Sequence, residues 1–345
     1  MRGFHGTTYL MKSNTDELGE KVTMPMKRDG STRIFYTGDI HGSDTIYRKA
    51  LNAGAFYKAG VLIFGGDLSG KAIVILTEIP GGKYACDFMG RHYELATETE
   101  VEGIEQLISV NGFYSCRMGS DELAALGHDE AKKEALFQKV VFERTARWMQ
   151  LAEDKLSGKG IRCYMMLGND DPPEIAGLIE ACPVVENPES RCVRLDESHE
   201  MISLGFSNPT PWHTVRELEE PDLAECIAAL MADVRDPSNC VFNLHAPPHG
   251  SGLDSAPLLD EQLKLRRAGG QAEMGAVGST AVRDAIERWQ PLLGLHGHIH
   301  ESGGMMKIGR TLCINPGSAY SEGFLCGALV VLNAKGVATY QMTRG

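Results

Sequence analysis

Three histidines stand within five positions near the C-terminal end of the chain: His296, His298 and His300. They follow a short apolar segment, where three imidazoles are hard to explain as core packing. Neutral imidazole is a common metal ligand. Because alternate side chains of an extended backbone lie on one face, we predict that His298 and His300 each reach a metal ion. His245 follows another apolar segment and would supply a further imidazole, although a lone histidine is more often structural.

Oxygen ligands occur in three more short motifs. Asp39 and His41 form an Asp-x-His pair between glycines, whose backbone freedom would let both side chains point at one cation. Asp67 and Asn169 each follow a glycine. The two oxygens of a carboxylate can bridge two cations, so Asp67 is the candidate shared ligand, and Asn169 would add a neutral oxygen. Each motif alone is compatible with an ordinary turn or helix cap.

Short apolar segments must position these residues. Five of them precede the candidate ligands, at residues 33–37, 61–64, 163–167, 240–244 and 292–295. Each ends at glycine or polar residues, which predicts a buried strand that leads into a loop. In open α/β sheets, the loops at the carboxyl ends of the strands share one crevice. We therefore predict an α/β fold, with further strands at 311–315, 327–333 and 337–342, built as a sandwich of two sheets flanked by helices.

The interval between the second and third motifs is long. Asp67 and Asn169 are 169 minus 67, or 102, positions apart, more than one crossover helix requires. Residues 71–76 and 83–88 have the pattern of a hairpin, and residues 129–156 have helical spacing. We predict a domain over residues 31–345 with an insertion at about 71–160 beside the cleft, and a weakly patterned N-terminal arm over residues 1–30.

Composition narrows the function. The formal net charge of −12 disfavours a wide basic surface for nucleic acid. Nine scattered cysteines without a Cys-x-x-Cys pair indicate reduced, cytoplasmic chemistry. The first residues lack the apolar run of a leader peptide, and nowhere in the sequence do about eighteen apolar residues follow one another, so we expect neither secretion nor a membrane span. The oligomeric state stays open, and a homo-oligomer is one of the arrangements that the sequence allows.

Taken in order, the five motifs resemble those of the calcineurin-like metallophosphoesterase superfamily: D-x-H, G-D, G-N-[HDCN], a lone His and G-H-x-H. The match runs from Asp39 to His300. The resemblance implies a four-layered αββα sandwich that holds two divalent or trivalent metal ions. The implied ligands of one ion are Asp39, His41, Asp67 and His300. The implied ligands of the other are Asp67, Asn169, His245 and His298.

This resemblance also implies a reaction. Two cations would activate a water as hydroxide for attack on a phosphomonoester or phosphodiester, with a small molecule or nucleotide as substrate. Mixed nitrogen and oxygen ligands suit Mn, Fe, Zn or Co. The second motif lacks the Asp-Arg-Gly of the protein Ser/Thr phosphatases, which disfavours that branch. An inactive scaffold of the same fold and a nuclease are the alternative functions.

The general acid is the open part of the site. Asp170 stands where many members carry a histidine, and it could protonate the leaving group if Asp171 raised its pKa. The alternative is that both are solvated turn residues. His249 is a second candidate, with a surface position as the alternative. Residues 208–216 and 275–280 could contact substrate, the latter through a helix N-terminus that would accept phosphate, and ordinary loop structure is the alternative for each segment.

Overall fold

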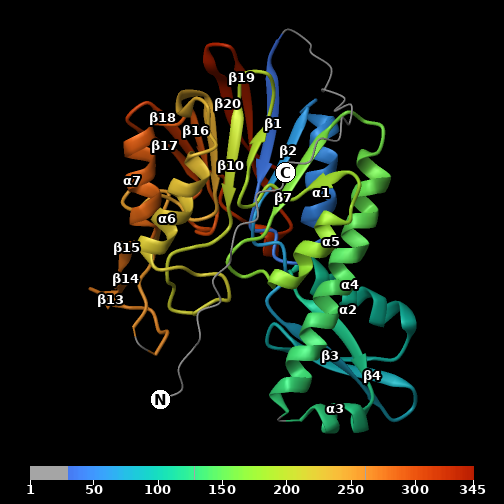
Figure 1. Cartoon of the computed structure of the whole chain (residues 1–345). Helices are drawn as coiled ribbons and strands as arrows, with labels where there is room; N and C mark the ends of the chain where they lie inside the picture. Colours follow the sequence, from blue (N-terminus) through green and yellow to red (C-terminus); the bar gives the residue numbers. More distant parts are fainter. Residues whose placement is uncertain (1–29, 128, 261) are drawn as a thin grey trace.

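The structure, a computed structural model, describes residues 30–127, 129–260 and 262–345. The predicted N-terminal arm, apart from Gly30, lies outside the described residues. Two six-stranded sheets form the centre of the protein, and helices lie outside both of them (Figure 1).

The first sheet has the strand order β20-β19-β1-β2-β7-β8. Strands β1, β2, β7 and β8 are parallel, and β19 and β20 extend the sheet antiparallel. The bounds are β1 Thr32–Thr37, β2 Val61–Gly65, β7 Arg162–Met166, β8 Val185–Glu186, β19 Cys326–Asn333 and β20 Gly336–Arg344.

The second sheet has the strand order β17-β18-β16-β11-β10-β9. Its four inner strands are parallel, and its two edge strands are antiparallel. The bounds are β9 Cys192–Arg194, β10 Glu200–Leu204, β11 Cys240–Leu244, β16 Leu293–Leu295, β17 Gly304–Ile308 and β18 Thr311–Asn315.

Side-chain alternation explains how the layers pack. In β2, Ile63 joins the cluster between the sheets, whereas Leu62 joins the cluster under the helices. In β11, Val241 faces the other sheet and Phe242 faces outward to helices. Because both faces of these strands are covered, their sequences are continuously apolar.

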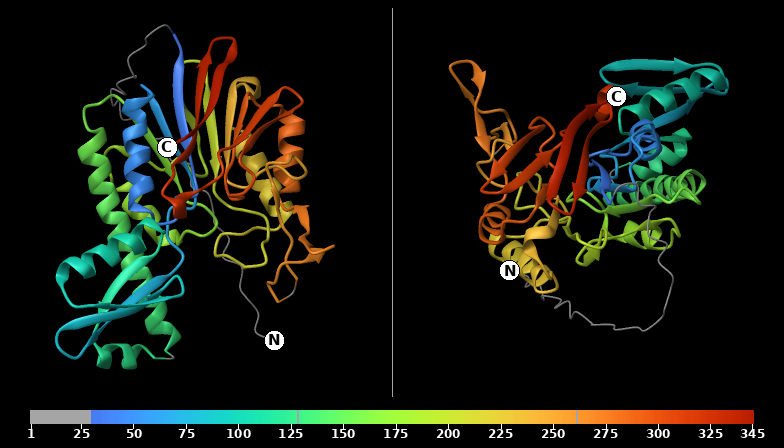
Figure 2. Two further views of the ribbon diagram at one scale, coloured as in Figure 1. Left: turned by 180° about the vertical axis from the view of Figure 1, so that it is seen from behind. Right: turned by 90° about the horizontal axis from the view of Figure 1, so that it is seen from above.

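Helices complete the outer layers. Helices α1 Asp44–Phe56, α4 Glu130–Leu156 and α5 Ala176–Glu180 cover the first sheet, and α6 Glu220–Met231 and α7 Thr280–Trp289 cover the second (Figures 1 and 2). The result is the predicted four-layered αββα sandwich. No helix within the described part of the chain is long and apolar enough to cross a membrane.

A third sheet occupies the long interval between β2 and β7. Its strand order is β5-β4-β3-β6, with bounds β3 Ile73–Ile79, β4 Lys83–Phe88, β5 Arg91–Leu95 and β6 Tyr114–Met118. Strands β3 and β4 form the hairpin expected near residues 71–88, and β5 and β6 extend it. Helices α2 Glu98–Val110 and α3 Ser120–Leu126 belong to the same interval, and Figure 1 shows this part beyond one end of the first sheet.

Short elements fill the remaining loops. Two small ribbons pair β12 Ser255–Pro257 with β15 Met274–Ala276, and β13 Arg267–Ala268 with β14 Gln271–Ala272. Single 3-10 turns occur at Pro173–Ile175, Pro237–Asn239 and Tyr320–Glu322.

Candidate metal centre

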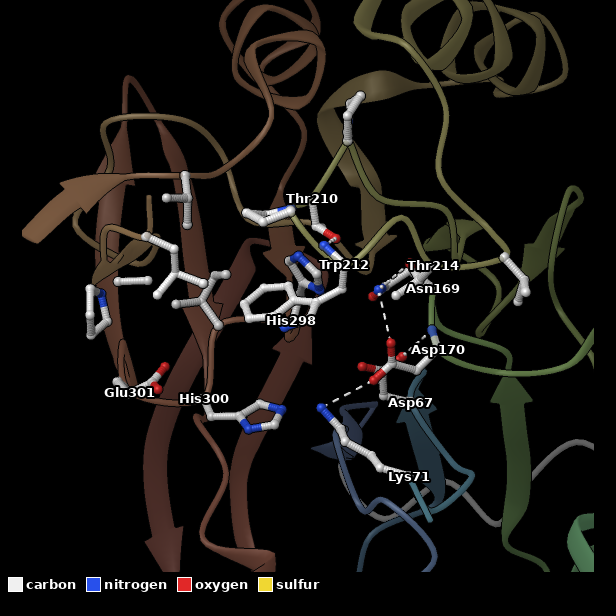
Figure 3. Close-up of a pocket in the computed structure, with 18 of the residues that line it drawn as sticks. Asp67, Lys71, Asn169, Asp170, Thr210, Trp212, Thr214, His298, His300 and Glu301 are labelled. Carbon is white, nitrogen blue, oxygen red and sulfur yellow. Dashed lines mark hydrogen bonds and ion pairs between the residues drawn. The ribbon is translucent and has the colours of Figure 1, made fainter. Parts of the chain in front are cut away.

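The loops that follow β1, β2 and β7 in the first sheet meet those that follow β11 and β16 in the second. This convergence brings all the predicted ligands together. Figure 3 shows four of them, Asp67, Asn169, His298 and His300. Two groups result: Asp39, His41, Asp67 and His300 form the first, and Asp67, His245 and His298 form the second, with ligand atoms of each group within 4.8 Å of one another.

In the first group, the imidazoles and carboxylates face a common point. His41 Nε2 lies 2.9 Å from His300 Nε2 and 3.7 Å from Asp67 Oδ2. His300 Nε2 lies 3.6 Å from Asp39 Oδ1. Four donor atoms from three loops can therefore surround one cation.

In the second group, His245 is the central contact. Its Nε2 lies 3.3 Å from Asp67 Oδ1 and 3.0 Å from Asn169 Oδ1, and its ring centroid lies 5.3 Å from that of His298. Its Nδ1–H donates to the carbonyl of Gly65 at 2.8 Å, which fixes the ring so that Nε2 faces the other candidate ligands. Asp67 thus directs Oδ2 to the first group and Oδ1 to the second.

Four of the candidate ligands have left-handed backbone conformations. The φ angles are 52° at Asp39, 38° at His41, 52° at Asp67 and 68° at His298. Such conformations cost about 1–3 kcal/mol each for residues with a Cβ and concentrate at functional sites. The sequence-based expectation of an extended backbone through His298 was wrong, since a bend at this residue separates the two histidines.

Hydrogen bonds between loops hold these conformations. The backbone N–H of Asp39 donates to Gly66 O at 3.0 Å, and that of His41 donates to Asp67 O at 3.0 Å. Glycine is required where the loops touch: a Cβ at Gly168 would lie 2.1 Å from Asp67 Oδ1, and one at Gly297 would lie 2.5 Å from Asp39 Oδ2. The glycines of the motifs therefore provide space as well as flexibility.

Burial and the neighbouring carboxylates together set the protonation of the histidines. Burial lowers the pKa of His41 to about 3 and that of His298 to about 4, so both imidazoles are neutral and able to bind a metal ion. Burial also acts to lower the pKa of His245, but Asp67 and Asp39 outweigh it and raise that pKa to about 10. The site therefore attracts positive charge.

These residues fit bound metal. Asp39 Oδ2 and His41 Nδ1 are buried and have no hydrogen-bond partner among the described residues. A buried carboxylate oxygen without a donor is costly, and a cation would satisfy it. The donors are carboxylate, amide and imidazole without thiolate, a set that suits Mn, Fe, Co or Zn.

Asp170 lies beside the centre and pairs with a lysine that the sequence analysis missed. Its carboxylate is 3.1 Å from Lys71 Nζ and 4.0 Å from His41 Nδ1, and its backbone N–H donates to Asp67 Oδ1 at 3.1 Å. Burial and then the charge of Asp67 raise the pKa of Asp170 to about 6, against the opposing effect of Lys71. The sequence signal for Lys71 was its position shortly after Asp67.

Asp171 is a buried structural group, not a solvated turn residue. Its side chain accepts from the backbone N–H groups of Leu68, Ser69 and Gly168 at 2.7–3.0 Å and from the Ser69 hydroxyl at 2.6 Å. It therefore joins the loops after β2 and β7. Its charge contributes less to the raised pKa of Asp170 than burial and Asp67 do.

The structure does not bring His249 to the metal centre. Its side chain is 45% exposed, lies 3.9 Å from Asp254 and does not line the cavity over the centre. His296 is also outside the ligand groups: it is buried and donates its Nδ1–H to the carbonyls of Leu244 and Ala246. The third histidine of the cluster thus supports the end of β11.

Over the two groups lies a cavity of about 750 Å³ (Figure 3). Several residues of the predicted contact segment line it, among them Thr210, Trp212 and Thr214, and Asn169 Nδ2 donates to Thr214 Oγ1 at 2.9 Å. At the start of α7, where a phosphate site was one of two alternatives, the Glu220 carboxylate already accepts from the N–H groups of Thr280 and Ala281, so these donors are not free to bind phosphate.

The protein is thus a layered α/β protein with a carboxylate and imidazole cluster able to hold metal. No family model matches the chain. An uncharacterized protein of Methanocaldococcus jannaschii is 30% identical over 128 residues, which are 36% of this chain and 51% of that protein. This chain therefore spans about half the length of that relative.

Solved structures resemble the fold at low identity. One shares 13% identity at a TM-score of 0.55, over 91% of this chain and 99% of its own. The protein TT1561 of Thermus thermophilus shares 14% sequence identity at a TM-score of 0.49, over 91% of this chain and 98% of its own. A novel archaeal phosphodiesterase shares 10% sequence identity at a TM-score of 0.29, over 91% of this chain and 100% of its own. At these values only the first likeness carries weight, and it supports the layered fold alone.

Proposed function

We propose that this protein is a phosphoric ester hydrolase that uses two metal ions. The observation that carries the proposal is the orientation of Asp67, whose two carboxylate oxygens face two separate groups of ligands. A carboxylate shared in this way is a feature of two-metal hydrolytic sites. When bound, the ions would supply Lewis-acid activation of the phosphate and of the attacking water.

The chain's own residues perform the other tasks. Asn169 and His245 come from different sheets, so both sheets fix the geometry of the centre. Lys71, at the edge of the cavity, would bind a phosphoryl oxygen. Asp170 would donate a proton to the leaving oxygen, because its raised pKa favours the protonated form more than an ordinary carboxyl does.

Metal reconstitution tests the proposal. Protein stripped with a chelator should not hydrolyse p-nitrophenyl phosphate or bis-p-nitrophenyl phosphate. Titration with Mn²⁺, Co²⁺, Zn²⁺ or Fe²⁺ should restore hydrolysis of at least one ester, with activity rising until two ions are bound per chain. Absence of hydrolysis above the buffer rate with every metal would favour the inactive scaffold. The intact set of ligands argues against that alternative.

Lys71→Met should lower kcat/KM for the better of these esters by about 10- to 100-fold, because a positive charge near the phosphoryl oxygens is lost. Lys71→Arg should recover part of the loss. Steady-state kinetics at saturating metal provide the measurement. The matched control is Lys335→Met, since Lys335 is exposed and lies in the β19–β20 turn at the opposite end of the first sheet. Equal rates for Lys71→Met and the control would exclude a phosphate contact.

A further inference from the structure

The cavity extends from the metal centre to two apolar walls. One wall belongs to the loop after β10 and includes Trp212 and Val215. The other belongs to the segment between β11 and α7 and includes Leu258, Leu259 and Leu265. The two walls line one continuous space together with four of the candidate ligands, Asp67, Asn169, His298 and His300 (Figure 3).

Large apolar side chains in the first wall face the solvent. Trp212 is 63% exposed and Val215 is 69% exposed. The loop nevertheless has a defined structure, because the Glu217 carboxylate accepts from the Thr214 N–H at 2.7 Å and from the hydroxyls of Thr210 and Thr214 at 2.6 Å. Exposed apolar groups on such a braced loop indicate a ligand contact.

Hydrogen bonds connect the walls to the metal centre. Thr214 accepts from Asn169, a candidate ligand, and Asn208 Nδ2 donates to Val277 O at 3.1 Å across the two wall segments. A group attached to a phosphate at the centre would therefore lie between the walls.

The charges of the cavity restrict what this group can be. Among the described residues that line the cavity, Lys71 is the single lysine or arginine, and it lies at the metal end. Lys264, Arg266 and Arg267 belong to the second wall segment but do not line the space. A nucleic acid or polyphosphate would need further cations along its path.

We infer that the walls bind an uncharged apolar group esterified to the phosphate, so that the substrate is the phosphoester of an apolar alcohol. The inference rests on the proposed function and specifies the part of the substrate that leaves. Its physical basis is the removal of apolar surface from water on both sides of the bound group.

A homologous series of esters tests the inference. Ethyl, butyl and hexyl phosphate and their methyl diesters have leaving groups of nearly equal basicity, so differences in kcat/KM report contact with the walls. The metal-loaded full chain should prefer hexyl over ethyl by about tenfold, since each additional methylene is partly buried. Adenosine monophosphate should be a poorer substrate than hexyl phosphate.

Trp212→Ala should reduce the hexyl-to-ethyl ratio by severalfold, whereas Phe56→Ala should leave it unchanged. Phe56 is a matched control because it is an aromatic side chain, 78% exposed, at the end of α1. Binding to the metal-free chain, followed by tryptophan fluorescence, should show the same preference for hexyl phosphate. The inference is overturned if neither kcat/KM nor binding changes from ethyl to hexyl phosphate. It is also overturned if Trp212→Ala has the same hexyl-to-ethyl ratio as the parent chain. Cleavage of bis-p-nitrophenyl phosphate with a flat series would leave the proposed hydrolase intact.

Discussion

Asp67→Asn should lower phosphoester hydrolysis by about 1000-fold or more and reduce the metal content below two ions per chain. Asp67 is the one residue shared by both ligand groups, and its oxygens lie 3.7 Å from His41 Nε2 and 3.3 Å from His245 Nε2. An amide presents one oxygen and no charge, so it cannot bridge two cations. Because metal ions provide several kcal/mol of transition-state stabilisation, a loss of about 4 kcal/mol corresponds to three powers of ten.

Steady-state kinetics and elemental analysis of the same preparation check this result. Asp87→Asn is the matched control, because Asp87 lies on β4 with an 84% exposed side chain and contacts His92, away from the centre. If Asp67→Asn keeps both ions and a rate within tenfold of the parent chain, the bridging role of Asp67 is wrong. Unchanged thermal stability of the variant would show that the loss comes from the centre and not from unfolding.

Asp171→Asn should lower the free energy of unfolding by about 3 kcal/mol, the largest stability effect that we expect near the site. The Asp171 carboxylate is fully buried and accepts from three backbone N–H groups and one hydroxyl. An asparagine amide would place an NH₂ donor against some of these donors. Buried donors would then lose their partners without access to water.

Chemical denaturation of the metal-free protein measures this effect without a contribution from bound ions. Ser69→Ala is the matched comparison, since it removes only the hydroxyl that donates to Asp171 and should cost about 1 kcal/mol. Equal effects of the two substitutions would mean that the backbone N–H groups find other acceptors. Activity of refolded, metal-loaded Asp171→Asn should also fall, because the loops after β2 and β7 carry Asp67 and Asn169.

Most of the sandwich was predictable because its signals are local. The segment Val61–Gly65 is entirely buried, and such continuous apolar runs between glycine and polar residues identify strands covered on both faces. The candidate ligands were predictable for a related reason, since each follows such a strand and carries a donor atom that suits a cation. These local signals do not predict the order of the strands within each sheet, because strand pairing joins segments far apart in the chain.

The supporting residues were harder to predict. Asp170 and Asp171 are neighbours of the same type in sequence, yet Asp170 pairs with Lys71 and Asp171 is enclosed by N–H groups from two loops. His249 and His245 both follow β11, yet only His245 reaches Asp67. Residue type and position along the chain do not tell which member of each pair reaches the centre. The direction of each side chain depends on backbone bends such as those at Asp39, His41, Asp67 and His298.

Local patterns along the chain therefore identify the strands of the two sheets and nominate the polar residues after them as candidate metal ligands. Strand length, apolar periodicity and donor chemistry are properties of short segments, and they do not depend on the rest of the molecule. The apolar walls, the clamp made by Asp171 and the pairing of Lys71 with Asp170 depend on contacts between loops of different strands. Those contacts exist only after the two sheets have packed, because burial and distance, and not residue type, determine what each of these groups does.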